Sequence, residues 1–244
     1  MTERLGTTTV GDFVAADFRT ASVFEQFGID YCCGGRRTLA EACRIGGADP
    51  DALVRALDAL PPAGGHEDDV TQWSPERLIG YIVSTHHAYL RSALPAITGD
   101  LAALLEADRS RHPELSRVAA YFDQMHRDLA QHLLKEEQVL FPYVRDLATW
   151  DASYARQGSP FGTVENPIRM MEREHRDATD ALRTIRELTH GFTAPPDGGA
   201  AYIACMAELA RFERDLHRHV HLENNVLFPK AVELEAGRFS RDNQ

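Results

Sequence analysis

Hydrophobic residues recur at alternating steps of three and four positions in four long stretches of the chain, all after residue 73. This spacing places them on one face of an α-helix, so it predicts four amphipathic helices, each with one buried seam. Polar connections separate the four stretches, which favours an up-down-up-down four-helix bundle over residues 73–236. The expected starts lie at Ser74-Pro75, after Pro113, at Asn166-Pro167 and after the loop at 195–199.

The first sixty residues carry shorter helical patterns with clear start and stop signals. Thr38 and Glu41 form a capping-box signature, and Asp49-Pro50 is a typical helix start. Two further short helices are expected after Thr9 and over the segment TASVFEQFG. Prolines and glycines at 61–65 indicate a linker. We therefore expect an all-α protein with a small helical domain at 1–62.

Six polar residues occupy positions on the four seams where apolar side chains are expected. A single histidine there is more often a hydrogen-bonded core residue. A buried carboxylate costs several kcal/mol unless it is paired, however, and no Lys or Arg lies on these seams nearby. A bound metal would provide a partner for all six polar side chains. They are His87, His132, Glu136, His175, His219 and Glu223.

The spacing of these residues supports a metal site. His132/Glu136 and His219/Glu223 are both HxxxE pairs, and residues four apart lie on one helix face about 5–6 Å apart. The segments HLLKEEQVLFPYV (132–144) and HVHLENNVLFPKA (219–231) also match at His, Glu, Val, Leu, Phe and Pro. We interpret them as two copies of a helical hairpin. The prolines predict a packed, kinked helix end in each copy.

The first helix offers two adjacent histidines, His86 and His87. The repeat matches only approximately there, and the stripe Val83, His87, Leu90, Leu94 is the smoother one, so we choose His87. In the second helix the same spacing extends the seam from Glu136 to Val139.

Four imidazoles and two carboxylates are too many ligands for one zinc ion and suit two metals. Two bridging carboxylates and two histidines would give each metal four ligands, with room for an oxo or hydroxo bridge and an exchangeable position. Iron, manganese and zinc all accept these ligands. Iron is favoured because open dinuclear sites in helical bundles carry out O₂ or NO chemistry. A ferritin-like site is disfavoured because ExxH occurs once, at Glu172/His175.

The vicinal pair Cys32-Cys33, followed by Gly34-Gly35, admits two interpretations. It could be a small-residue turn, or it could present two accessible thiols that bind iron, take up NO or form a disulfide. We expect the small domain to dock with these thiols facing the entrance to the metals. Cys43 and Cys205 fit buried apolar positions.

Several charged residues lie beside the ligand candidates. Asp128 lies one turn before His132, and Glu174 lies beside His175. Both are candidates for acids that hydrogen-bond to the metal ligands. Alternatively, both are solvated charges on the helix surface. Glu137 is expected to be a partner of another group at the surface. His126, His217 and His221 are expected on solvated faces.

The overall composition excludes several functions. The net charge of −11 disfavours binding to nucleic acid or to an anionic membrane. The chain shows no apolar core of signal-peptide or transmembrane length, and its four cysteines form no disulfide framework. We therefore expect a cytoplasmic protein with reduced thiols.

The ligand set and the segment DYCCGG (30–35) together resemble the iron-sulfur cluster repair di-iron proteins of the RIC, ScdA and YtfE type. That family joins an N-terminal ScdA-type domain to a hemerythrin-like bundle. The resemblance implies a non-heme di-iron centre, damaged iron-sulfur proteins as partners, NO or O₂ as small ligands, and repair by iron donation. It leaves open two alternatives, an NO or O₂ reductase and a gas or redox sensor. Whether the protein is an enzyme and whether it forms a homodimer also stay open.

Overall fold

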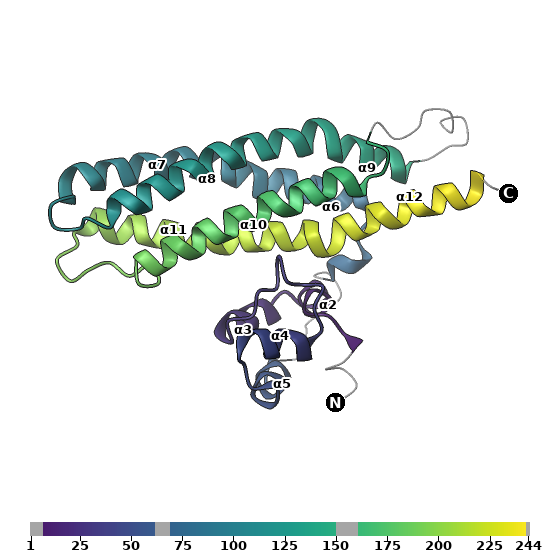
Figure 1. Ribbon diagram of the computed structural model, residues 1–244, viewed down its shortest axis with the longest axis horizontal. Helices are drawn as coiled ribbons and strands as arrows, with labels where there is room; N and C mark the ends of the chain where they lie inside the picture. Colours follow the sequence, from purple (N-terminus) through teal and green to yellow (C-terminus); the bar gives the residue numbers. More distant parts are fainter. Residues whose placement is uncertain (1–6, 62–68, 150–160, 243–244) are drawn as a thin grey trace. The chain divides into compact units, whose positions relative to one another are not determined.

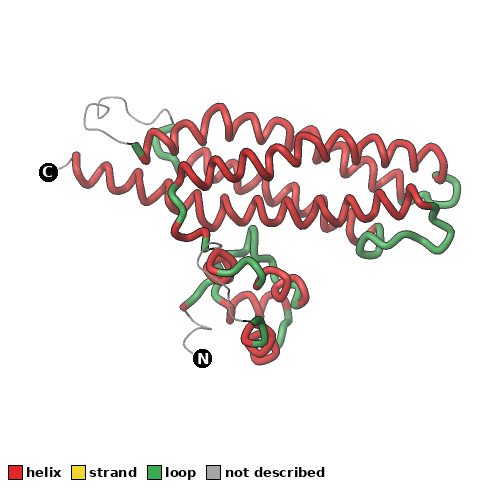
Figure 2. The backbone as a smooth tube through the Cα atoms, turned by 180° about the vertical axis from the view of Figure 1, so that it is seen from behind, coloured by secondary structure: helices red, strands yellow, loops and turns green. Residues whose placement is uncertain are grey.

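The computed structural model describes residues 7–61, 69–149 and 161–242. Helices dominate this part of the chain (Figures 1 and 2), and its only β feature is an isolated bridge between Thr9 and Thr38. The prediction of an all-α protein is confirmed. Residues 62–65 of the predicted linker lie outside the described ranges. No helix within those ranges has the length and apolar character needed to span a bilayer.

The chain divides into two compact units. The first contains residues 1–79, 144–165 and 218–244, and the second contains 80–143 and 166–217. The four boundaries, after residues 79, 143, 165 and 217, all fall within helices, so each of these helices contributes to both units.

The second unit is built from four long helices that lie side by side (Figure 1). Apolar residues from the predicted seams fill the space between them. Phe122 and Phe212, for example, are fully buried, and their rings meet edge to face at 5.3 Å. The helices are α7 (Ala88–Asp108), α8 (Leu115–Lys135), α10 (Glu165–Leu188) and α11 (Ala200–Leu222).

Three π-helical segments interrupt the long helices. Ile82–His87 joins α6 (Pro75–Tyr81) to α7. Glu136–Leu140 joins α8 to α9 (Phe141–Ala148), and Glu223–Leu227 joins α11 to α12 (Phe228–Asp242). Pro142 and Pro229 follow two of these segments. A proline ring clashes with the carbonyl four residues earlier in an α-helix, and a wider π turn relieves that clash.

The π segments correct two positions of the predicted seams. Val83 is half-buried, whereas its neighbour Ile82 is fully buried. Val139 is exposed, whereas Leu140 is buried. A π turn contains an extra residue, so the inward face moves by about one position relative to the α-helical spacing on which the prediction rested.

Between Val10 and Asp58 the first unit contains four short helices, which confirms the pattern predicted for this part of the chain. Capping boxes start two of them, Thr9 with Asp12 and Thr38 with Glu41. Gly28, after the second helix, has a φ of 66°, which suits glycine. The helices are α2 (Val10–Ala16), α3 (Thr20–Gln26), α4 (Leu39–Gly46) and α5 (Pro50–Asp58), followed by a 3₁₀ turn at Val70–Gln72.

Candidate metal centre

Three histidines surround the carboxylate of Glu136 within the second unit. Nε2 of His87 and Nε2 of His132 lie 3.4 and 3.3 Å from its Oε2, and Nε2 of His175 lies 3.9 Å from its Oε1. All four side chains are buried. Within the described residues, neither oxygen of Glu136 accepts a hydrogen bond of good geometry. A buried carboxylate among imidazoles is a costly arrangement unless a cation joins it.

The imidazoles of His132 and His175 also face each other, with their Nε2 atoms 3.0 Å apart. Two nitrogens in neighbouring positions of one six-coordinate cation, with bonds of about 2.1 Å, are separated by about 3 Å. The spacing of these two nitrogens therefore fits ligands of a shared ion.

The second HxxxE pair lies in the first unit. Nε2 of His219, near the end of α11, is 3.0 Å from Oε1 of Glu223, the first residue of the following π segment. Both side chains are fully buried. The pair thus repeats the arrangement of His132 and Glu136.

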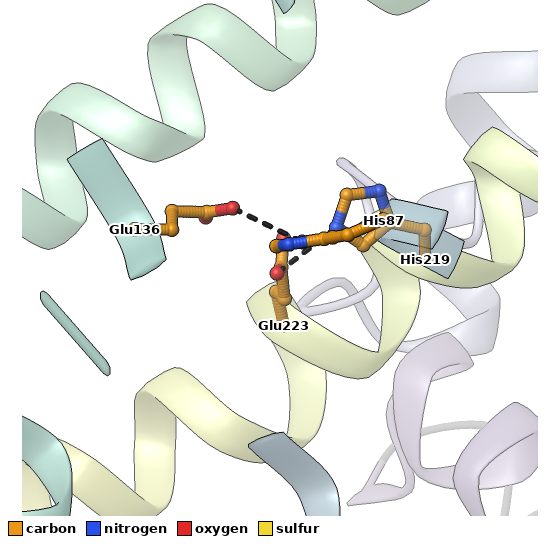
Figure 3. Close-up of side chains that lie close together, drawn as sticks. All are labelled: His87, Glu136, His219 and Glu223. Atoms are coloured by element: carbon orange, nitrogen blue, oxygen red, sulfur yellow. Dashed lines mark ion pairs between the residues drawn. The ribbon is translucent and has the colours of Figure 1, made fainter. Parts of the chain in front are cut away.

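The candidate ligand atoms form two groups, and within each group they all lie within 4.8 Å of one another. Both groups contain both glutamates, and each adds two different histidines. One group is His87, Glu136, His219 and Glu223, shown in Figure 3. The other is His132, Glu136, His175 and Glu223.

His87 and not His86 belongs to these groups. His86 is buried as well, but its Nδ1 lies 3.0 Å from Asp215 Oδ1, and its ring packs against Tyr81. Nδ1 of His87 instead faces Glu137, and its Nε2 faces Glu136.

Glu137 has partners, as expected, but it is less exposed than a surface residue. It is half-buried, its Oε1 accepts from His87 Nδ1 at 2.7 Å, and Arg91 donates to the same oxygen. Burial opposes ionisation, but the bonds from His87 and Arg91 outweigh it and lower the pKa of Glu137. A carboxylate at Nδ1 keeps the proton there and leaves Nε2 available as a ligand.

Glu174 holds His132 in the same way. Its Oε2 lies 2.9 Å from His132 Nδ1, and Lys135 donates to its other oxygen. The hydrogen bond from His132, with help from Lys135, lowers the pKa of Glu174 to about 2. Asp128, the other acid considered from the sequence, is exposed and accepts two hydrogen bonds from Gln124. The structure therefore brings Glu174, but not Asp128, to a ligand candidate.

The cysteine turn differs from the expected accessible turn. Cys32 is buried and Cys33 is half-buried, with their sulfur atoms 3.9 Å apart. Oδ1 of Asp30 accepts from the backbone N–H of Cys32 at 3.0 Å and of Cys33 at 2.9 Å. The neighbouring Cys33 thiol, followed by burial, raises the pKa of the Cys32 thiol. Cys43 and Cys205 are buried, as predicted.

The glycines after the cysteines permit close contacts that a larger side chain would prevent. A Cβ on Gly35 would lie 2.3 Å from Oδ1 of Asn225. Nδ2 of Asn225 donates to the carbonyls of Tyr31 and Cys32 at 3.1 Å, and Asn224 donates to the same Cys32 carbonyl at 3.3 Å. The cysteine turn is thereby held against the two residues that follow Glu223.

His221 is a second correction in this region, because it is fully buried and not solvated. Its ring packs near Phe18 and Tyr31, and its Nδ1 lies 3.1 Å from Asn225 Nδ2. Burial lowers its pKa to about 4, so it is neutral at physiological pH. His126 and His217 are half-buried.

Two family models match the chain. Residues 6–61 match ScdA_N, a domain of unknown function (DUF542), and residues 79–231 match the hemerythrin HHE cation binding domain. Curated relatives span nearly the full length. A protein of Musicola paradisiaca is 34% identical over 233 residues, covering 93% of this chain and 97% of the relative. One of Dickeya chrysanthemi is 32% identical, covering 92% and 96%. Both are named iron-sulfur cluster repair protein YtfE.

Proposed function

Because the chain belongs to the family of YtfE-type iron-sulfur cluster repair proteins, with ScdA_N and hemerythrin HHE domains, we propose that it repairs iron-sulfur clusters damaged by nitrosative or oxidative stress. The expected hemerythrin-like bundle after a small helical region is confirmed. A cation-binding bundle is shown by the match of the HHE model. The nature of the cations, their ligands and the route of repair are our proposals.

The cations are two iron ions, and their ligands are the six seam residues named from the sequence. The observation that carries this assignment is the buried Glu136 carboxylate among three imidazoles. Each group of four contains both glutamates and two histidines, which suits two ions bridged by carboxylates. When bound, such an iron pair supplies electron exchange and an open position for small ligands such as NO or O₂.

The protein groups around the ligands keep them ready for the metal. Glu137 and Glu174 hold the protons of His87 and His132 at Nδ1, so both Nε2 atoms face inward as acceptors. Lys135 and Arg91 compensate the two acids at the protein surface. The buried Phe141 stacks on the His87 ring, with centroids 5.6 Å apart, and covers that face of the imidazole.

In repair by iron donation, the partners of this protein are iron-sulfur proteins with damaged clusters. We expect this to take place in the cytoplasm. The cysteine turn contributes to this process, since Asn224 and Asn225 hold it next to Glu223.

Reactivation of a damaged enzyme tests the proposal. A dehydratase whose cluster has been destroyed by NO is incubated with the iron-loaded protein, and its activity is followed. Wild-type protein restores activity, whereas Glu136→Ala does not. A Cys32→Ser/Cys33→Ser double variant that keeps its iron and loses reactivation would support repair. Steady NO consumption with a reductant by the same variant, with no reactivation by the wild type, would instead identify an NO reductase and refute the proposal.

A further inference from the structure

A third group of candidate ligands lies outside the helical seams. Asp30, Cys32 and Cys33 each offer one ligand atom, and these atoms lie within 4.8 Å of one another. The turn itself brings them together, because Oδ1 of Asp30 accepts from the backbone N–H groups of both cysteines. The carboxylate is thus fixed beside the two thiols.

The distances in this group fit a tetrahedral cation. Two thiolates bound at about 2.3 Å are about 3.8 Å apart, and a thiolate and a carboxylate oxygen are about 3.5 Å apart. The sulfur atoms of Cys32 and Cys33 are separated by 3.9 Å, and Cys32 Sγ lies 3.3 Å from Asp30 Oδ1. Little movement would therefore be needed to bind an ion.

The backbone around the group is held in place. A Cβ on Gly34 would lie 2.6 Å from the carbonyl oxygen of Asp30, so the turn closes tightly on itself. The carbonyl of Cys32 is fixed by Asn224 and Asn225. A site whose ligands are already ordered binds at a lower entropic cost than a flexible pair of cysteines.

We propose that Asp30, Cys32 and Cys33 form a second metal site, which binds one divalent transition-metal cation through two thiolates and one carboxylate. Binding releases the two thiol protons to solvent. The fourth coordination position stays open to water or to an incoming ligand, as in three-ligand zinc sites. Asp30 is exposed and Cys33 half-buried, so the ion can enter and leave from solvent.

Such a site suits transient loading more than permanent storage, because three ligands and an open position allow exchange. The inference rests on the proposed function only for the identity of the cargo, which would be ferrous iron on its way to a damaged cluster. The binding site itself is independent of that function.

Cobalt(II) tests the site directly, because thiolate ligands produce sulfur-to-cobalt charge-transfer bands that histidine and carboxylate ligands do not. The full-length protein is first loaded with iron, its thiols are reduced, and Co²⁺ is added. We expect bands that saturate at one equivalent per chain. Cys32→Ser and Cys33→Ser each abolish the two-thiolate spectrum. Cys205→Ser, which removes a buried thiol elsewhere, leaves it unchanged.

The variant Asp30→Asn isolates the carboxylate. Its amide oxygen can still accept from both backbone N–H groups, so the turn is retained while the charged ligand is lost. We expect the affinity for Co²⁺ to fall about tenfold or more. Unchanged iron content in each variant shows that the protein is folded.

Three results would overturn the site: no sulfur bands in the reduced wild type, bands that survive Cys32→Ser, or equal affinity in Asp30→Asn. The cluster-reactivation assay separates this failure from that of the proposed function. A protein that binds Co²⁺ at the cysteines but never restores a cluster would refute repair alone. A protein that restores clusters without binding Co²⁺ there would refute the site alone.

Discussion

The two copies of the HxxxE repeat share their ligand candidates but differ in their surroundings. His132 and Glu136 in the first copy match His219 and Glu223 in the second, and all are buried. Leu134 is 45% exposed, whereas the matching His221 is fully buried. Val139 is 45% exposed, whereas the matching Val226 is 4% exposed. The candidate ligand positions are therefore alike in the two copies, whereas the flanking positions have different surroundings.

The residues that follow each glutamate have different contacts in the two copies. Glu137 in the first copy orients His87, and Gln138 is exposed. The matching Asn224 and Asn225 in the second copy hold the carbonyl of Cys32. One copy therefore supports another metal-ligand candidate, and the other connects the centre to the cysteine turn.

The largest expected effect concerns what the copies share. Glu136→Ala and Glu223→Ala should each cause loss of both ions, because each glutamate belongs to both groups. Asp128→Ala, which removes an exposed acid from the helix of His132, should retain them. Metal analysis of the purified variants, with helix content as a folding control, measures this. If one glutamate variant loses its metal and the other keeps both ions, the two copies are not equivalent.

The next largest effect is expected on stability, at the position where Asn225 in one copy matches Gln138 in the other. Asn225→Leu should lower the free energy of unfolding by about 2 kcal/mol, because the carbonyls of Tyr31 and Cys32 lose the Asn225 amide, although Asn224 still donates to Cys32. Gln138→Leu, the matching change at the exposed position, should alter it by about 0.5 kcal/mol or less. Urea unfolding of the metal-free proteins compares them. Similar losses in both variants would show that the contact with the cysteine turn contributes nothing.

A smaller effect on metal binding is expected at Glu137, which forms a hydrogen bond with the candidate ligand His87. Glu137→Gln should weaken metal affinity about 10- to 100-fold, because the amide holds the proton of His87 less firmly. Asn224→Ala, at the matching position, should change it far less, since Asn224 bonds to a backbone carbonyl. Competition with a chelator measures both. An equal loss in the two variants would contradict the division of roles between the copies.

The smallest effect on stability is expected at the matching valines, Val139 and Val226. Val226→Thr places a hydroxyl in a buried site and should cost about 1–3 kcal/mol of unfolding free energy. Val139→Thr should be close to neutral, because the side chain is exposed. Thermal unfolding of both variants provides the comparison, and a larger loss at Val139 would contradict the difference in burial between the two copies.

The sequence predicted the helices and the candidate ligands because both follow from the periodicity of a single helix. His132 and Glu136 stand out since each interrupts an apolar seam at a regular position. The spacing failed at Val83 and Val139, where the π segments move the inward face. An α-helical period cannot reveal an extra residue in a turn.

The remaining errors concern contacts between distant parts of the chain. Cys32 and His221 are buried because the cysteine turn and the last long helix cover each other. Glu137 meets His87 from a different helix. The sequence of one helix does not indicate which distant residues pack on its flanking face, so these partners could be found only in the structure.

Two iron ions that share the buried glutamates should be magnetically coupled. Metal analysis combined with Mössbauer spectroscopy can detect this in protein purified after expression in iron-supplied cells. We expect two irons per chain with the spectrum of a coupled pair. A single tightly bound zinc, or iron without coupling, would contradict this expectation.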